Sequence, residues 1–127
     1  GPTKVTEIDN GKIKSFEISP NDAGLKTHAF EEIQGGSVEF NAKKISELAD
    51  GIKNGFLDSV LFNSAAAMYI SGKSDNLKNG VQSATGAILN GNTKKKYNIT
   101  CVRKFEINKS KTQLPVSSEE ILFIVLL

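Results

Sequence analysis

The tripeptide Asp9-Asn10-Gly11 constrains the fold of this chain more than any other feature of the sequence. Asn and Gly tolerate the positive φ angles that a tight hairpin turn requires. β-Branched residues are frequent before the turn, in residues 3–8, and Phe16 and Ile18 share one face of the segment that follows it. The sequence therefore predicts a β-hairpin. Two strands alone bury too little surface to be stable, so the hairpin must join a larger sheet or pack on helices.

The residues after the hairpin predict a loop and then a first long helix. Pro20 ends the second strand because proline lacks the N–H group that a ladder needs, and residues 23–36 are loop-like, with one helical turn at Ala29–Ile33. Ser37 is the expected N-cap of the helix, and Gly55 is the expected left-handed residue at its end. The apolar positions of this helix are Phe40, Ile45, Leu48, Ala49 and Ile52.

A second helix is expected to begin with Asp58 as its N-cap and to end at Gly72. Its apolar residues Leu61, Ala65 and Met68 follow helical spacing, and the small side chains at positions 65–67 allow close approach of neighbours. This helix is predicted to lie at the centre of the helical part.

A third helix is expected between the capping pair Ser74-Asp75 and Gly91. Gly80 and Gly86 each lower helix propensity by about 1 kcal/mol relative to Ala, so both glycines indicate close packing against a neighbour. The helix carries one apolar stripe, formed by Leu77, Val81, Ala84 and Ile88.

The sequence changes character after Gly91. All eleven glycines lie at or before this position, and strand-like pieces follow at Tyr97–Val102 and Phe105–Ile107. The net charge is −2 over residues 1–93 and +4 over residues 94–127. We therefore assign residues 1–93 to one domain and residues 94–127 to an atypical tail. The expected fold class is α+β, a β-hairpin followed by about three helices and an irregular tail.

Composition excludes several classes of protein. Hydrophobic residues make up 39% of the chain, enough for a small core and too many for a disordered chain. A net charge of +2 argues against a nucleic-acid partner. The single cysteine, Cys101, excludes an internal disulfide and a cysteine-based zinc site. The run Ile121–Leu127 is far shorter than the roughly 20 residues that span a bilayer, and the chain opens without a visible leader. We expect a cytoplasmic protein with no membrane partner.

The residues that could carry chemistry are scattered along the chain. His28 has no second His or Cys with which to bind a metal, so a surface loop histidine is expected. The pairs Glu31-Glu32 and Glu119-Glu120 are interpreted as solvated charges, because helical neighbours point to different faces. Gly35-Gly36 lacks the spacing of a phosphate-binding loop and is interpreted as a helix entry.

Three further features have a simple interpretation. Lys94-Lys95-Lys96 is expected to be a solvated run, Cys101 a buried or incidental thiol, and the sequons at Asn98 and Asn108 unused. These residues assemble no catalytic site, so chemistry alone does not indicate a function.

One stretch nevertheless resembles a known family. The segment Asn63-Ser64-Ala65-Ala66-Ala67, then Gly72-Lys73, and then Leu77 with Gly80-Val81 is similar to the C-terminal helical region of the anthranilate phosphoribosyltransferase family. Upstream features agree in order: the opening Gly1–Val5, the turn Asp9-Asn10-Gly11, Pro20 with Gly24-Leu25, and Gly35-Gly36 followed by Asn41-Ala42. The resemblance covers residues 1–93.

The resemblance implies an activity for a parent enzyme. Members of this family transfer the 5-phosphoribosyl group of phosphoribosyl pyrophosphate to anthranilate, a step of tryptophan biosynthesis that depends on Mg²⁺. It also implies an α/β class for the parent, a central sheet flanked by helices, and a homodimer formed by a helical domain that this chain does not contain.

The family's working parts are missing from this sequence. Its Gly-Thr-Gly-Gly-Asp phosphate loop, its Lys-His-Gly-Asn segment and its Asp-Glu metal pair do not occur. The resemblance therefore implies no catalytic, substrate-binding or metal-binding residue here, and we expect a fragment that is inactive alone and holds no Mg²⁺. It also stops after Thr93, and a reading-frame slip within the lysine run is one hypothesis for the tail.

Two alternatives to this transferase fragment stay open. One is a fragment of a nucleoside phosphorylase-type enzyme from the same superfamily. The other is a small non-enzymatic helical interaction module that binds a partner through the stripe Leu77, Val81, Ala84 and Ile88.

Overall fold

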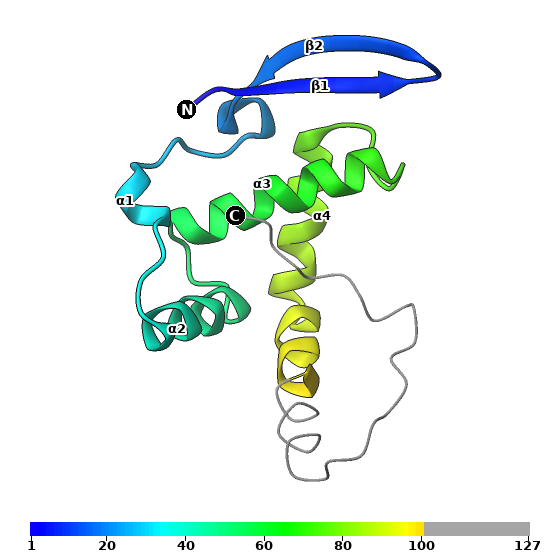
Figure 1. Cartoon of the computed structure of the whole chain (residues 1–127). Coiled ribbons are helices and arrows are strands. Elements are labelled where there is room, and N and C mark those ends of the chain that lie inside the picture. The colour runs from blue at the N-terminus through cyan, green and yellow to red at the C-terminus, as the bar shows by residue number, and fades with distance from the viewer. Residues whose placement is uncertain (101–127) are drawn as a thin grey trace, which may run out of the picture.

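The computed structural model describes residues 1–100. It is an α+β arrangement in which a β-hairpin lies above a group of helices, as Figure 1 shows. The predictions for Cys101, Phe105–Ile107, Asn108, Glu119-Glu120 and Ile121–Leu127 lie outside the described residues. The elements, in chain order, are β1 (Thr3–Asp9), β2 (Lys12–Ile18), the 3₁₀ helix η1 (Pro20–Ala23), α1 (Phe30–Ile33), α2 (Val38–Ala49), α3 (Gly55–Ile70) and α4 (Leu77–Leu89).

The predicted hairpin is confirmed with its register. β1 and β2 pair in antiparallel fashion from Thr3 opposite Ile18 to Asp9 opposite Lys12. Asn10 and Gly11 have φ angles of 48° and 77°, the conformation that the turn requires. The Tyr69 hydroxyl of α3 donates a hydrogen bond of 3.3 Å to the Glu7 carboxylate, which ties the hairpin to the helices.

The core lies between α3 and α4, which cross each other in Figure 1. α3 is central, as predicted, since it also contacts η1, α1 and α2. The stripe of α4 faces the core: Val81 and Ala84 are buried, with Leu77 and Ile88 packed beside them. The buried cluster consists of Ala23, Leu57, Leu61, Ala65, Val81 and Ala84.

The two predicted glycine contacts have different outcomes. Gly80 is buried, and a Cβ atom there would lie 2.8 Å from the Ala65 Cα atom, so the backbones of α3 and α4 touch at this point. Gly86 has no heavy atom within 4 Å of such a Cβ atom, so the prediction of close packing is wrong there.

The predicted start of α2 is confirmed, but its end is different. The Phe40 N–H donates to the Ser37 hydroxyl at 3.2 Å. The helix ends at Ala49, and Gly51, with φ 73°, is the left-handed residue instead of Gly55. The N–H groups of Gly51 and Ile52 bond the carbonyls of Leu48 and Glu47, which is the Schellman closure. Ile52 therefore lies beyond the helix.

The N-caps of α3 and α4 also correct the sequence predictions. Asn54, not Asp58, caps α3, and its side chain accepts the Leu57 N–H at 2.9 Å. Asn76, not Ser74-Asp75, caps α4 by accepting the Asn79 N–H at 2.8 Å. The predicted helix ends are confirmed, since Gly72 and Gly91 adopt φ angles of 70° and 79°.

Residues 92–100 are helical, so the predicted strand at Tyr97–Val102 is wrong over its described part. The Asn90 side chain accepts the Asn92 N–H at 3.0 Å, and the Lys95 N–H bonds the Gly91 carbonyl at 2.9 Å. These bonds start a new helical segment directly after Gly91. β-Branched residues at positions 99 and 100 favour a strand locally, and the helix start upstream overrides that preference.

Replacing the Asn54 cap tests the corrected start of α3. Asn54→Ala is expected to lower the free energy of unfolding by about 1 kcal/mol, because the first turn of the helix loses its side-chain acceptor. The matched control is Asn63→Ala in the exposed middle of the same helix, where Ala improves helix propensity. Urea unfolding followed by circular dichroism measures both changes, and equal losses would contradict the assignment of the cap.

Candidate functional site

The most concentrated group of ionisable side chains in the described residues surrounds His28. Its Nε2 atom lies 2.8 Å from the Asp58 Oδ2 atom, and its Nδ1 atom lies 3.1 Å from the Glu32 Oε2 atom. The three residues come from the loop before α1, from the first turn of α3 and from α1 itself. The His28 side chain is 19% exposed, so it is largely covered rather than a free surface residue.

The local sequence explains how this group forms. Glu32 ends the first turn of α1, where its carboxylate also accepts the Ala29 N–H at 3.2 Å. Gly55 begins α3 directly beneath the imidazole. A Cβ atom at Gly55 would lie 3.0 Å from the His28 Cγ atom and 3.1 Å from the Glu32 Cβ atom. The missing side chain at Gly55 therefore lets His28 reach Asp58.

The electrostatics of the group favour the charged imidazole. The hydrogen bond to Asp58, followed by the one to Glu32, raises the pKa of His28 above its ordinary value of 6.5. The pKa of Glu32 is lowered, chiefly by the bond to His28 and then by the Ala29 N–H. Because two carboxylates flank one ring, the protonated form can donate to both of them.

This geometry is not suited to acid–base or nucleophilic catalysis. A catalytic histidine keeps one ring nitrogen directed at the substrate or nucleophile, whereas both nitrogens of His28 contact carboxylates. The two carboxylates also bind opposite sides of the ring and do not converge on one point. Over residues 1–100, no set of three or more His, Cys, Asp or Glu side chains is arranged to hold a metal ion.

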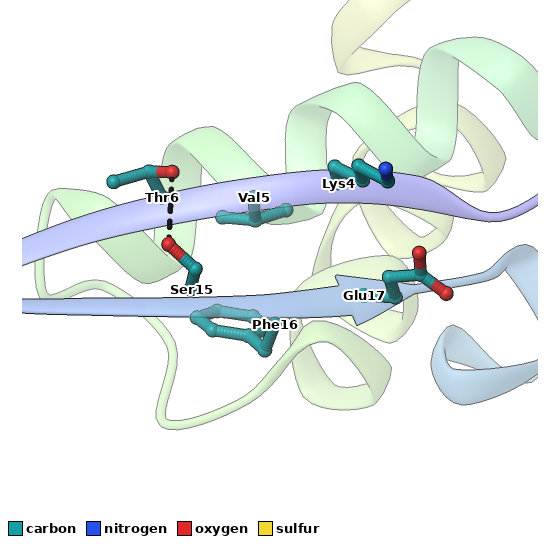
Figure 2. A pocket seen from close by; sticks show the side chains of 6 residues that line it. All are labelled: Lys4, Val5, Thr6, Ser15, Phe16 and Glu17. Carbon is teal, nitrogen blue, oxygen red and sulfur yellow. Dashed lines mark hydrogen bonds between the residues drawn. The ribbon is translucent and has the colours of Figure 1, made fainter.

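A second candidate is a shallow hollow of about 320 Å³ on the hairpin. Figure 2 shows its lining, Lys4, Val5, Thr6, Ser15, Phe16 and Glu17, with the Thr6 and Ser15 hydroxyls joined by a hydrogen bond of 3.2 Å. These hydroxyls contact each other rather than a base, so the hollow contains no activated nucleophile. It is a surface feature of the strand pair.

The remaining predicted features are placed as follows. Gly35-Gly36 is a helix entry, as predicted: the Gly36 N–H donates to the Asn41 side chain at 2.9 Å, and the Asn41 amide donates back to the Gly36 carbonyl at 3.1 Å. Lys94-Lys95-Lys96 is exposed, and Lys94 forms an ion pair with Asp50.

The predicted loop position of His28 is confirmed, but the side chain is half-buried and bonded to two carboxylates instead of free in solvent. Its partner Asp58 lies 30 residues away in the sequence, where the local pattern favours a helix cap instead. The only local signal is Glu32, four residues after His28, a spacing that places two side chains on one face where the chain is helical.

No helix within residues 1–100 has both the length and the apolar character needed to cross a membrane.

Comparison with known proteins adds a family. A family model described as "Glycosyl transferase family, a/b domain" matches residues 1–94. The chain is 44% identical over 94 residues to the anthranilate phosphoribosyltransferase of Parvibaculum lavamentivorans, which covers 74% of this chain and 28% of the relative. It is 42% identical over 103 residues to the Hyphomonas neptunium enzyme of the same name, covering 81% and 30%. It is 40% identical over 94 residues to the Rhodospirillum rubrum enzyme of that name, and the match covers 74% of this chain and 27% of the relative.

Proposed function

Because the chain belongs to the glycosyl transferase family, a/b domain, we propose that it is part of an anthranilate phosphoribosyltransferase. The complete enzyme would transfer the 5-phosphoribosyl group of phosphoribosyl pyrophosphate to anthranilate in tryptophan biosynthesis. The observation that carries this proposal is the 37–44% identity of relatives that all have this name. The chain spans 26–30% of the length of these relatives.

The described residues would serve this enzyme as scaffold rather than as catalyst. Ile8 and Ile13 pair across the hairpin, and each is 72% exposed. An exposed apolar pair on a two-stranded sheet is typical of a surface that another part of a protein covers. We propose that the hairpin joins the central sheet of an α/β domain and that α3 and α4 pack beside that sheet.

The described residues do not fit a Mg²⁺ site. Mg²⁺ prefers carboxylate oxygens with several retained waters, and the Asp58 and Glu32 carboxylates are each bound to His28. We propose that the complete enzyme uses Mg²⁺ on residues outside this chain. We also propose that it is a cytoplasmic homodimer, and the absence of nucleic-acid and membrane partners stays a prediction.

A chimeric enzyme tests the proposed function. Residues 1–94 would replace the matching segment of the Parvibaculum lavamentivorans enzyme, and turnover of anthranilate with phosphoribosyl pyrophosphate would be followed by the loss of anthranilate fluorescence. We expect kcat/KM within about tenfold of the parent, or about 1.4 kcal/mol of transition-state stabilisation, because the exchanged part supports the site without entering it.

Two controls make this test decisive. The 127-residue chain alone, given the same substrates and Mg²⁺, is expected to show no turnover. A chimera that unfolds cooperatively at the parent's midpoint but has lost all turnover would contradict the proposal.

The two alternatives have separate tests. If the chain were part of a nucleoside phosphorylase-type enzyme, the gene sequence upstream of Gly1 would contain neither an Asp-Glu pair nor a Gly-Thr-Gly-Gly-Asp motif. The interaction-module hypothesis places partner binding on the stripe of α4, Leu77, Val81, Ala84 and Ile88. These residues pack into the core, so the prediction of this binding surface is wrong.

A further inference from the structure

We propose that His28 is a proton-dependent clasp that holds the α1 segment, residues 26–35, against the first turn of α3 and holds it less tightly when the imidazole loses its second proton. The basis is a count of protons. An imidazolium ring has two N–H donors, and here each ring nitrogen lies within hydrogen-bond distance of a carboxylate oxygen. A neutral ring has one donor, so one nitrogen lone pair would then face a carboxylate.

No other cation in the described residues replaces the lost charge. The groups that face His28 are the Glu32 carboxylate from α1 and the Asp58 carboxylate from α3, and the ion pairs of both within residues 1–100 are with His28. Deprotonation therefore leaves two carboxylates beside a neutral ring. The one remaining N–H can serve only one carboxylate and no longer carries a positive charge. The His28–Asp58 bond, the only one of the two that joins the α1 segment to α3, is therefore weakened.

No residue of the α1 segment is buried, and only His28 and Ile33 are partly covered. α1 is four residues long and has no buried residue, and Phe30 is 67% exposed. The chain is fixed on both sides: Leu25 packs against the core before the segment, and the Asn41 side chain binds Gly36 after it. Loosening would thus be confined to residues 26–35, which lie against Gly55 at the start of α3.

The sign of the effect follows from proton linkage. The folded-state pKa of His28 is raised, so the stabilisation from the clasp is fully present below the ordinary value of 6.5 and is lost as the pH rises through the folded-state value. The lowered pKa of Glu32 keeps its carboxylate charged through this range. The α1 segment is therefore held most tightly at low pH.

The chain contains one histidine, so every imidazole NMR signal of the full chain reports on His28. We expect its titration midpoint to lie above 6.5, and we expect the amide signals of residues 26–35 to shift with the same midpoint while those of α4 stay fixed. A midpoint at or below that ordinary value, or amide shifts in the α1 segment that do not follow the ring, would overturn the proposal.

Variants separate the clasp from a general charge effect. Asp58→Asn and Glu32→Gln each keep the shape of one partner and remove its charge, so each should lower the His28 midpoint. Glu31→Gln is the matched control, since the neighbouring carboxylate of α1 is not bonded to His28. An equal change in all three variants would reduce the effect to bulk electrostatics and reject the clasp. The titration of the unaltered chain decides the matter if a variant does not fold.

Discussion

Gly80→Ala is expected to lower the free energy of unfolding by about 2 kcal/mol. The added Cβ atom would lie 2.8 Å from the Cα atom, 2.9 Å from the Cβ atom and 3.1 Å from the carbonyl oxygen of Ala65. Two of these atoms are backbone, which cannot move aside as a flexible side chain can. α3 and α4 must therefore separate along their contact, and overpacking of this kind costs about 1–3 kcal/mol even though Ala is the better helix former.

Gly86→Ala in the same helix is the matched control. No heavy atom lies within 4 Å of the position that the added methyl group would take, so Ala there adds helix propensity without a clash and should stabilise the chain by about 0.5–1 kcal/mol. Urea unfolding followed by the circular dichroism of the helices measures both variants. Changes of the same sign would contradict the close contact of α3 with α4.

Features with local causes could be predicted from the sequence. The hairpin depends on two residues that tolerate positive φ, flanked by strand formers, and both strands occur where predicted. The Ser37 cap and the α4 stripe likewise depend on residues within a few positions of each other. The α+β class followed from these elements.

Features decided by distant contacts could not be predicted in this way. Gly51 and Gly55 are both glycines suited to a helix end, and Asn54 and Asp58 are both good caps. In the structure Gly55 lies against His28 and Glu32, and Asp58 bonds the imidazole, so neither residue has the capping role that the sequence predicted. A partner about 30 residues upstream has no signature in the local pattern of α3, so the sequence does not reveal the histidine group.

Leu61→Ala is expected to have the largest effect of any change discussed, a loss of about 3 kcal/mol in the free energy of unfolding. Leu61 is 5% exposed and belongs to the buried cluster between α3 and α4. Removing a buried leucine side chain loses its transfer free energy and leaves a cavity, which together cost about 2–5 kcal/mol. Within residues 1–100, four of the seven buried apolar residues, Ala23, Ala49, Ala65 and Ala84, are alanines. Few large side chains therefore remain to close the gap.

Ile70→Ala at the end of the same helix separates burial from residue chemistry. Ile70 is 84% exposed, so its loss should change the free energy of unfolding by less than about 0.5 kcal/mol. Leu61→Met keeps the volume at the buried position and should lower the free energy of unfolding by less than about 1.5 kcal/mol. This variant can still be measured if Leu61→Ala is too unstable to give a folded baseline. Equal midpoints for the alanine variants at positions 61 and 70 would mean that the α3–α4 contact is not the core. The order expected from burial is Leu61→Ala, then Leu61→Met, then Ile70→Ala, because the cost follows the volume that leaves the interior and not the number of methyl groups removed.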